Sequence, residues 1–154
     1  MPEILETSEI LPPLGILSHV TPGSRAALTD GGQFLSYAKG EAILEQGQPT
    51  EHLCILVSGE LAVTLRSPEQ LVPLGYIHEG EPVGEMGFLE GVEASAFVAA
   101  VVPSKVWQIS REAFGEFLSN SPAAGNELLM EIVKLLSQRA RKGHERLTQE
   151  QEEA

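Results

Sequence analysis

Between Phe34 and Ile109 the chain is divided into short apolar or alternating segments bounded by glycine, proline and serine. Many short segments at close spacing, with turn-forming residues between them, are typical of an antiparallel β-sandwich or barrel. The segment Leu61–Arg66 alternates between apolar and polar residues, which indicates a strand with one buried face. The other segments expected to form strands are Ile43–Leu44, Leu53–Val57, Leu71–Ile77, Phe97–Val102 and Val106–Ile109.

The period of the pattern changes after Ser110. Ser110 is a typical helix N-cap, and Phe114, Phe117 and Leu118 share one face of a helix predicted over 111–119. Asn120-Ser121-Pro122 ends this helix, and a longer one follows from about 126 to 147. We therefore predict a mainly β fold with flanking helices. Its centre is an antiparallel β jelly-roll (double-stranded β-helix) barrel, with a short N-terminal helical segment, a short helix after the last strand and a long C-terminal helix.

Apolar and small residues recur along the predicted long helix at alternating spacings of four and three. They are Leu129, Val133, Leu136, Ala140, Gly143 and Leu147. This spacing is the heptad pattern of a coiled coil, and the small residues would let two helices approach closely. We predict a homodimer through this helix. The alternative is that the apolar face packs only within the monomer, together with the neighbouring stripe of Leu128, Ile132 and Leu135.

Acidic residues dominate the chain, which has a formal net charge of −12. Residues 1–121 carry five basic and sixteen acidic side chains, and a surface of this sign repels nucleic acid. The only basic cluster, residues 139–142 with Arg146, is more simply explained as a solvated helix face than as a nucleic-acid contact. We expect no direct binding of nucleic acid.

Few features of the sequence indicate where in the cell the protein is located. The single cysteine, Cys54, lies in an apolar segment, so we predict a buried thiol in a reducing compartment. The first fourteen residues carry three glutamates and no basic region, which does not fit a secretory signal. No apolar segment is long enough to span a bilayer, and no membrane partner is expected. These features predict a soluble, cytoplasmic protein.

The most distinctive motif is Gly84–Ala100, which reads GEMGFLEGVEASAFVAA. It resembles the phosphate-binding cassette of the cyclic-nucleotide-binding domain family, which includes the sensor half of the catabolite activator protein. The family pattern is Gly-Glu-Leu-(Ala/Gly)-Leu, a short turn, then Arg-(Ala/Ser)-Ala-x-Val. Gly84–Phe88 and Ser95–Val98 match its two halves, and Ala94 occupies the arginine position. Further segments resemble the family in order and spacing: Leu17–Thr21, Tyr37–Ile43, Glu45–Pro49, Ile55–Val63 and Val106–Phe114.

The resemblance implies a ligand site at this cassette, formed by Gly84, Glu85, Met86, Gly87, Ala94, Ser95 and Ala96. In the family the glutamate accepts a hydrogen bond from the ribose 2′-hydroxyl, while backbone amides and the arginine hold the phosphate. Glu85 and Ser95 would keep their roles, but Ala94 supplies no charge. Losing a buried charge-assisted contact costs about 2–5 kcal/mol, or roughly thirty-fold to several thousand-fold in affinity. Cyclic AMP, cyclic GMP or another small anionic ligand is therefore predicted to bind weakly or not at all, and no other cofactor is expected. The alternative for Glu85 is that its carboxylate only caps loop amides.

The resemblance implies a non-catalytic regulatory sensor that passes its signal through the C-terminal helix. The alternative is a ligand-free module for dimerisation or for binding an unidentified protein partner. A cupin-like metal enzyme is a remote alternative, because His19, His52, His78 and His144 include no pair at ligand spacing. We therefore expect no metal site and no catalytic residues. The expected organisation is an N-terminal extension over 1–16, a cyclic-nucleotide-binding-like domain over 17–121 and a helix with an acidic tail over 122–154, without a helix-turn-helix domain.

Overall fold

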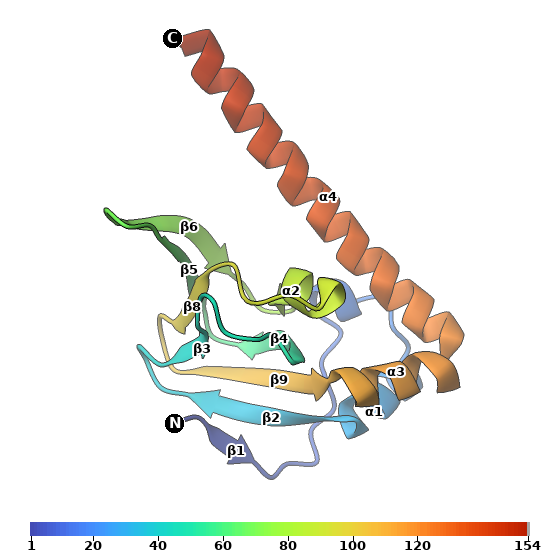
Figure 1. Cartoon of the computed structure of the whole chain (residues 1–154). Coiled ribbons are helices and arrows are strands. Elements are labelled where there is room, and N and C mark those ends of the chain that lie inside the picture. Colours follow the sequence, from blue (N-terminus) through green and yellow to red (C-terminus); the bar gives the residue numbers. More distant parts are fainter. Residues whose placement is uncertain (154) are drawn as a thin grey trace.

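Two antiparallel sheets and a long projecting helix make up the chain (Figure 1). The computed structural model describes residues 1–153, with the side chains of Met86, Arg146 and residues 150–153 left out. One sheet has the strand order β1-β2-β9-β4-β7 and the other β3-β8-β5-β6. The strands are β1 (Glu3–Leu5), β2 (Gly32–Tyr37), β3 (Ala42–Leu44), β4 (His52–Ser58), β5 (Leu61–Arg66), β6 (Leu71–Ile77), β7 (Pro82–Val83), β8 (Phe97–Ala100) and β9 (Ser104–Ser110).

This arrangement confirms the predicted fold class of a mainly antiparallel jelly roll with flanking helices. The two sheets face each other as a sandwich and do not close into a barrel. The predicted strands match the observed ones to within two residues at each end. Sequence reasoning omitted three strands: β1 and β2, which pair with each other, and the two-residue β7, which pairs with β4.

The five-stranded sheet is buried on both faces, and this explains the continuous apolar segment in β4. Leu53 and Ile55 point toward the helices, while Cys54 and Leu56 point toward the second sheet. Successive side chains of a strand face opposite sides of its sheet, so both faces must be apolar here. Burial confirms the predicted setting of Cys54 and raises the pKa of its thiol to about 12.

Helices cover the outer face of the five-stranded sheet (Figure 1). They are α1 (Pro22–Asp30), α3 (Arg111–Asn120) and the start of α4 (Pro122–Glu153). A 3-10 turn that precedes α1, η1 (Gly15–Leu17), packs in the same core. The Ser110 hydroxyl accepts a hydrogen bond from the amide of Ala113 at 3.2 Å, so the predicted N-cap is confirmed. The long helix begins at Pro122, four residues earlier than predicted, because proline ends α3 but is well tolerated as the first residue of a helix.

The remaining helix, α2 (Glu85–Glu90), lies within the cassette and links the two layers of the sandwich. Phe88 on α2 packs edge-to-face on Phe114 of α3, with ring centroids 5.6 Å apart. α4 then crosses beside α2 and continues away from the body of the molecule (Figure 1). The cassette therefore lies between the second sheet and the long helix.

Candidate functional site

Two glycines determine the backbone of the cassette. Gly84 has φ = 72°, a left-handed conformation that L side chains rarely adopt, and it starts α2 directly after β7. Gly87 packs closely on the preceding loop, since an added Cβ would lie 2.6 Å from Thr50 Oγ1. The following loop is held by two backbone hydrogen bonds, from Ala94 N to Gln48 O at 2.8 Å and from Gly47 N to Ala94 O at 2.9 Å.

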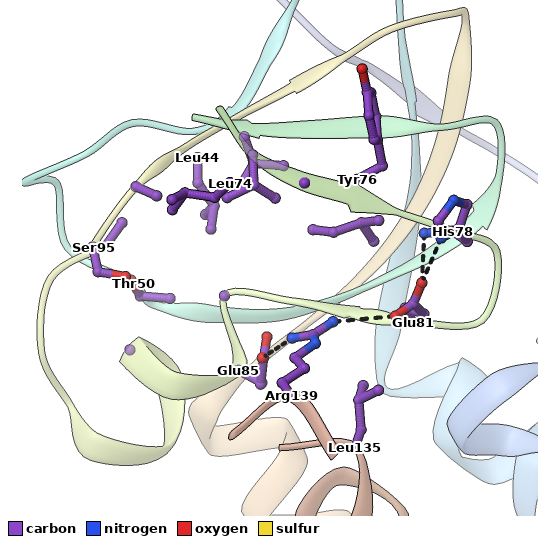
Figure 2. Close-up of a pocket in the computed structure, with 18 of the residues that line it drawn as sticks. Leu44, Thr50, Leu74, Tyr76, His78, Glu81, Glu85, Ser95, Leu135 and Arg139 are labelled. Atoms are coloured by element: carbon purple, nitrogen blue, oxygen red, sulfur yellow. Dashed lines mark hydrogen bonds and ion pairs between the residues drawn. The ribbon is translucent and has the colours of Figure 1, made fainter. Parts of the chain in front are cut away.

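A cavity of about 660 Å³ lies between the cassette, the second sheet and α4 (Figure 2). This volume is in the range of small-molecule sites, which are about 300–1,000 Å³. Leu44, Leu74 and Tyr76 line it on the sheet side, and Leu135 and Arg139 line it on the helix side. The cavity is large enough for a nucleoside-sized ligand.

A chain of charged side chains joins the cassette to α4 (Figure 2). Arg139 Nη1 donates to Glu85 Oε1 at 2.7 Å, and Arg139 Nη2 lies 3.3 Å from Glu81 Oε2. Glu81 Oε1 in turn lies 3.1 Å from His78 Nδ1. Glu85 is 5% exposed, so its carboxylate needs such a partner, because an unpaired buried charge is costly.

His78, Glu81, Glu85 and Arg139 lie together on one side of the cavity, away from Ser95 (Figure 2). The acidic and basic residues that line the cavity are His78, Glu81, Glu85, Arg139 and Lys142, all from the 78–85 segment or α4. Thr50, Ala94 and Ser95 also line the cavity, and none of these three side chains carries a charge. Ala94 is buried and lines the cavity, so a phosphate placed beside it would meet a methyl group and no charge.

The structure brings most of the predicted site residues together. Gly84, Glu85, Gly87, Ala94, Ser95 and Ala96 all line the one cavity, whereas the side chain of Met86 lies outside the described part. Sequence reasoning missed Arg139, which it assigned to a solvated helix face. The available signal was that no Lys or Arg occurs between Arg66 and Lys105, so any cation that pairs with Glu85 had to come from a distant part of the chain. Thr50, Glu81 and Lys142 were missed as well, and no motif marks them.

The predicted dimer residues divide into two groups on α4. Leu129 and Leu136 are partly buried against the protein's own core, beside the fully buried Leu128 and Ile132. Val133, Ala140, Gly143 and Leu147 are exposed. The neighbouring stripe of Leu128, Ile132 and Leu135 therefore packs within the monomer, as the alternative interpretation expected. Part of the predicted dimer stripe packs there as well.

The four histidines are spread over the molecule, on β4, α4 and two loops. Among the side chains that the structure describes, no three of His, Cys, Asp or Glu gather as a metal ion would require. None of the helices that the structure describes has the length and apolar character of a membrane-spanning segment.

Comparison with known proteins identifies the family. The family model for the cyclic nucleotide-binding domain matches residues 34–121, which is more than half of the chain. The chain belongs to the cyclic nucleotide-binding domain family. The predicted resemblance is thereby confirmed, and the matched region includes the whole cassette, residues 84–100.

Relatives within the cyclic nucleotide-binding family include transcription regulators. The chain is 30% identical over 105 residues to the cAMP-activated global transcriptional regulator CRP of Salmonella typhimurium, covering 67% of this chain and 48% of that protein. The chain thus spans about half the length of the curated relatives it matches.

Solved structures agree with this assignment. A cyclic nucleotide-binding domain from Methylobacillus flagellatus has a TM-score of 0.76 at 26% identity, covering 82% of this chain and 71% of that one. The Catabolite Activator Protein of Thermus thermophilus has a TM-score of 0.76 at 23% identity, covering 87% and 62%. The second likeness is one of fold alone.

Proposed function

We propose that this chain is a non-catalytic regulatory module that senses a small ligand in the cassette cavity and passes the signal through α4. The ion pair between Glu85 and Arg139 carries the proposal, because it joins the cassette directly to the long helix at 2.7 Å. In the family that the chain resembles, this glutamate accepts a hydrogen bond from the ligand's ribose. A ligand that engages Glu85 would therefore compete with Arg139 and change how α4 is held.

The energy available for such a signal is modest. Hydrogen bonds to charged groups contribute about 1.5–3 kcal/mol when buried, and exposed ion pairs contribute less. Arg139 is 39% exposed, so the lower part of that range applies. A ligand shifts a conformational equilibrium only by its differential affinity for the two states. A contact of this size can change the position of α4 without unfolding the domain.

Cyclic AMP and cyclic GMP are proposed to be poor ligands. At the end of the cavity where the family binds phosphate, this chain presents Ala94. Glu81 and Glu85 lie along the same cavity, and the guanidinium of Arg139 is already paired with both carboxylates. An incoming phosphate would have to displace one of these pairs or remain without a counter-charge.

The test is calorimetric titration with cyclic AMP and cyclic GMP of the natural protein, Ala94→Arg and the matched control Ala94→Gln. We expect millimolar or weaker binding by the natural protein and the control, and a gain of at least thirty-fold in Ala94→Arg. Hydrogen exchange of the α4 amides beyond Leu136, with and without nucleotide in Ala94→Arg, then measures the signal. Tight binding by the natural protein would contradict the role given to Ala94, and unchanged exchange would contradict the role given to α4.

The second candidate is a ligand-free module for dimerisation or for binding a protein partner. One observation favours it: Arg139 already satisfies Glu85, so the cassette has a partner without any ligand. If neither the natural protein nor Ala94→Arg binds a nucleotide, this candidate replaces the first. In both cases we propose a homodimer through α4, a cytoplasmic location and no direct contact with nucleic acid. Metal retained after dialysis, measured by elemental analysis, would instead favour an enzyme.

A further inference from the structure

Two carboxylates that line the cavity already bind one guanidinium. Arg139 Nη1 donates to Glu85 Oε1 at 2.7 Å, and Arg139 Nη2 donates to Glu81 Oε2 at 3.3 Å. Two nitrogens of one planar group therefore contact two different carboxylates (Figure 2). A guanidinium is a rigid fork of donors, whereas an ammonium is a point charge, so this pair of acceptors favours the fork.

The two sides of this contact differ in how firmly the protein holds them. Glu85 is 5% exposed and begins α2, and α2 is packed on the core through Phe88. The Arg139 side chain is 39% exposed and lies on α4 beyond Leu136, which packs against the core. The carboxylates therefore belong to the rigid body of the domain, and Arg139 is the partner that can leave.

The wall opposite the ion pairs suits an aliphatic stem. Leu44, Val63 and Leu74 line the cavity from the second sheet, and Figure 2 shows Leu44 and Leu74 across the cavity from Arg139. A ligand with a cationic head on the carboxylates could lay an alkyl chain along these side chains and remove apolar surface from water.

The charges of the lining also favour a cation once Arg139 has left. Glu81 and Glu85 then face the single ammonium of Lys142, so the lining is negative overall when His78 is counted as neutral. The net charge of the chain, −12, attracts cations to the domain as a whole. An anion would find the opposite balance.

We propose that the cavity takes a cationic ligand, a guanidinium compound with an aliphatic stem, which replaces Arg139 on Glu81 and Glu85. The inference rests on the proposed function, whose ligand class it names. Arg139 is then an internal competitor that holds α4 while the ligand is absent, and its release is the signal. Because a tethered group acts at an effective concentration of up to about millimolar, a variant without this arginine should bind the ligand more tightly than the natural protein.

The probes are butylguanidinium, butylammonium and butanol, which share one stem and differ in the head group. They are titrated into the natural full chain at constant ionic strength, and the amide resonances of Glu85 and Arg139 are followed by NMR. We expect saturable binding of butylguanidinium with a dissociation constant on the order of 1 mM, as for a fragment of its size. Butylammonium should bind about three-fold or more weakly, and butanol should not bind.

Four variants test the roles of the charged residues. Arg139→Gln removes the competitor and should tighten butylguanidinium binding about ten-fold or more. Lys142→Gln removes an equal charge from the same lining and should change it by no more than about two-fold. Glu85→Gln should weaken binding about ten-fold, since a charge-assisted contact is lost. Glu81→Gln, at a more exposed position, should weaken it about three-fold and keeps the test valid if Glu85→Gln does not fold.

Absence of butylguanidinium binding by the natural protein overturns this inference. Binding by Arg139→Gln alone also overturns it, because Arg139 would then be a permanent structural partner of Glu85. Equal gains in Arg139→Gln and Lys142→Gln would indicate a general charge effect and overturn it as well.

Hydrogen exchange of the α4 amides beyond Leu136 separates this inference from the proposed function. If butylguanidinium binds as expected and leaves this exchange unchanged, the ligand class stands and the signalling role fails. If a cyclic nucleotide changes this exchange in Ala94→Arg while the natural protein binds no butylguanidinium, the proposed function stands and this inference fails.

Discussion

The heptad spacing runs through both halves of α4, but the large apolar side chains are concentrated in the first half and the surroundings of the two halves differ. In the first half, Leu128 and Ile132 are 0% and 1% exposed and pack into the core formed with α3 and the five-stranded sheet. In the second half, Leu147 is 61% exposed. Among the described side chains of this half, Arg139 alone forms hydrogen bonds and ion pairs with the rest of the domain.

Under the proposed function, this difference would separate an anchoring half of the helix from a signalling half. The first half cannot move without exposing core residues, at about 1.5–3 kcal/mol for each large apolar side chain. The second half is held by a contact that a ligand in the cavity would reach first. A regulatory helix needs both properties, a fixed end and an end whose position depends on a weak, local interaction.

The largest expected effect compares one leucine from each half. Leu128→Ala should lower the free energy of unfolding by about 2–5 kcal/mol, because it leaves a cavity in the core. Leu147→Ala should change it by less than about 0.5 kcal/mol at low protein concentration, where an exposed side chain has little to lose. Urea unfolding measures both values. A large loss for Leu147→Ala in the monomer would show that the second half is packed and remove the contrast.

Association of two chains is the second test, because it would bury the exposed residues of the predicted dimer stripe, which include Val133 in the first half and Leu147 in the second. Val133→Glu places a charge on the predicted dimer face and should weaken a homodimer by about 2 kcal/mol or more, as expected for a central contact. Arg141→Gln shifts the net charge equally at a position outside the heptad stripe and serves as the control. Light scattering over a range of concentrations measures both, and a natural protein that stays monomeric at high micromolar concentration would refute the dimer.

The smallest expected effect concerns the contact at the cavity. Arg139→Gln leaves the Glu85 carboxylate buried without its cation and should lower stability by about 1 kcal/mol, since Arg139 is partly exposed and screened. Raising the salt concentration should reduce this difference, because the ion pair weakens in the natural protein. Midpoint temperatures at low and high salt measure it, with Lys142→Gln as the control. Equal losses for Arg139→Gln and Lys142→Gln would indicate a general charge effect and no specific pair.

The β-sandwich was predictable because its signals are local. The alternation in β5, the continuous apolar segment of β4 and the cap at Ser110 each depend on neighbouring residues, and all three appear in the structure. The cassette residues were found for the same reason, since Gly84 to Ala96 form one contiguous motif. β1 was missed because its three residues form a strand only by pairing with β2.

The pairing of Arg139 with Glu85 could not be predicted from local sequence patterns. The sequence alone predicted the jelly-roll class and the contiguous cassette motif, and the fold and the family confirm the class. Only the tertiary structure brought Arg139 to Glu85 across 54 residues, left Thr50 Oγ1 unpaired beside the cavity, and divided α4 into a buried and an exposed half. The physical reason is that pairing and burial depend on which surfaces meet in space. Helix periodicity predicts that one face is apolar, but it does not predict which other part of the molecule packs against that face.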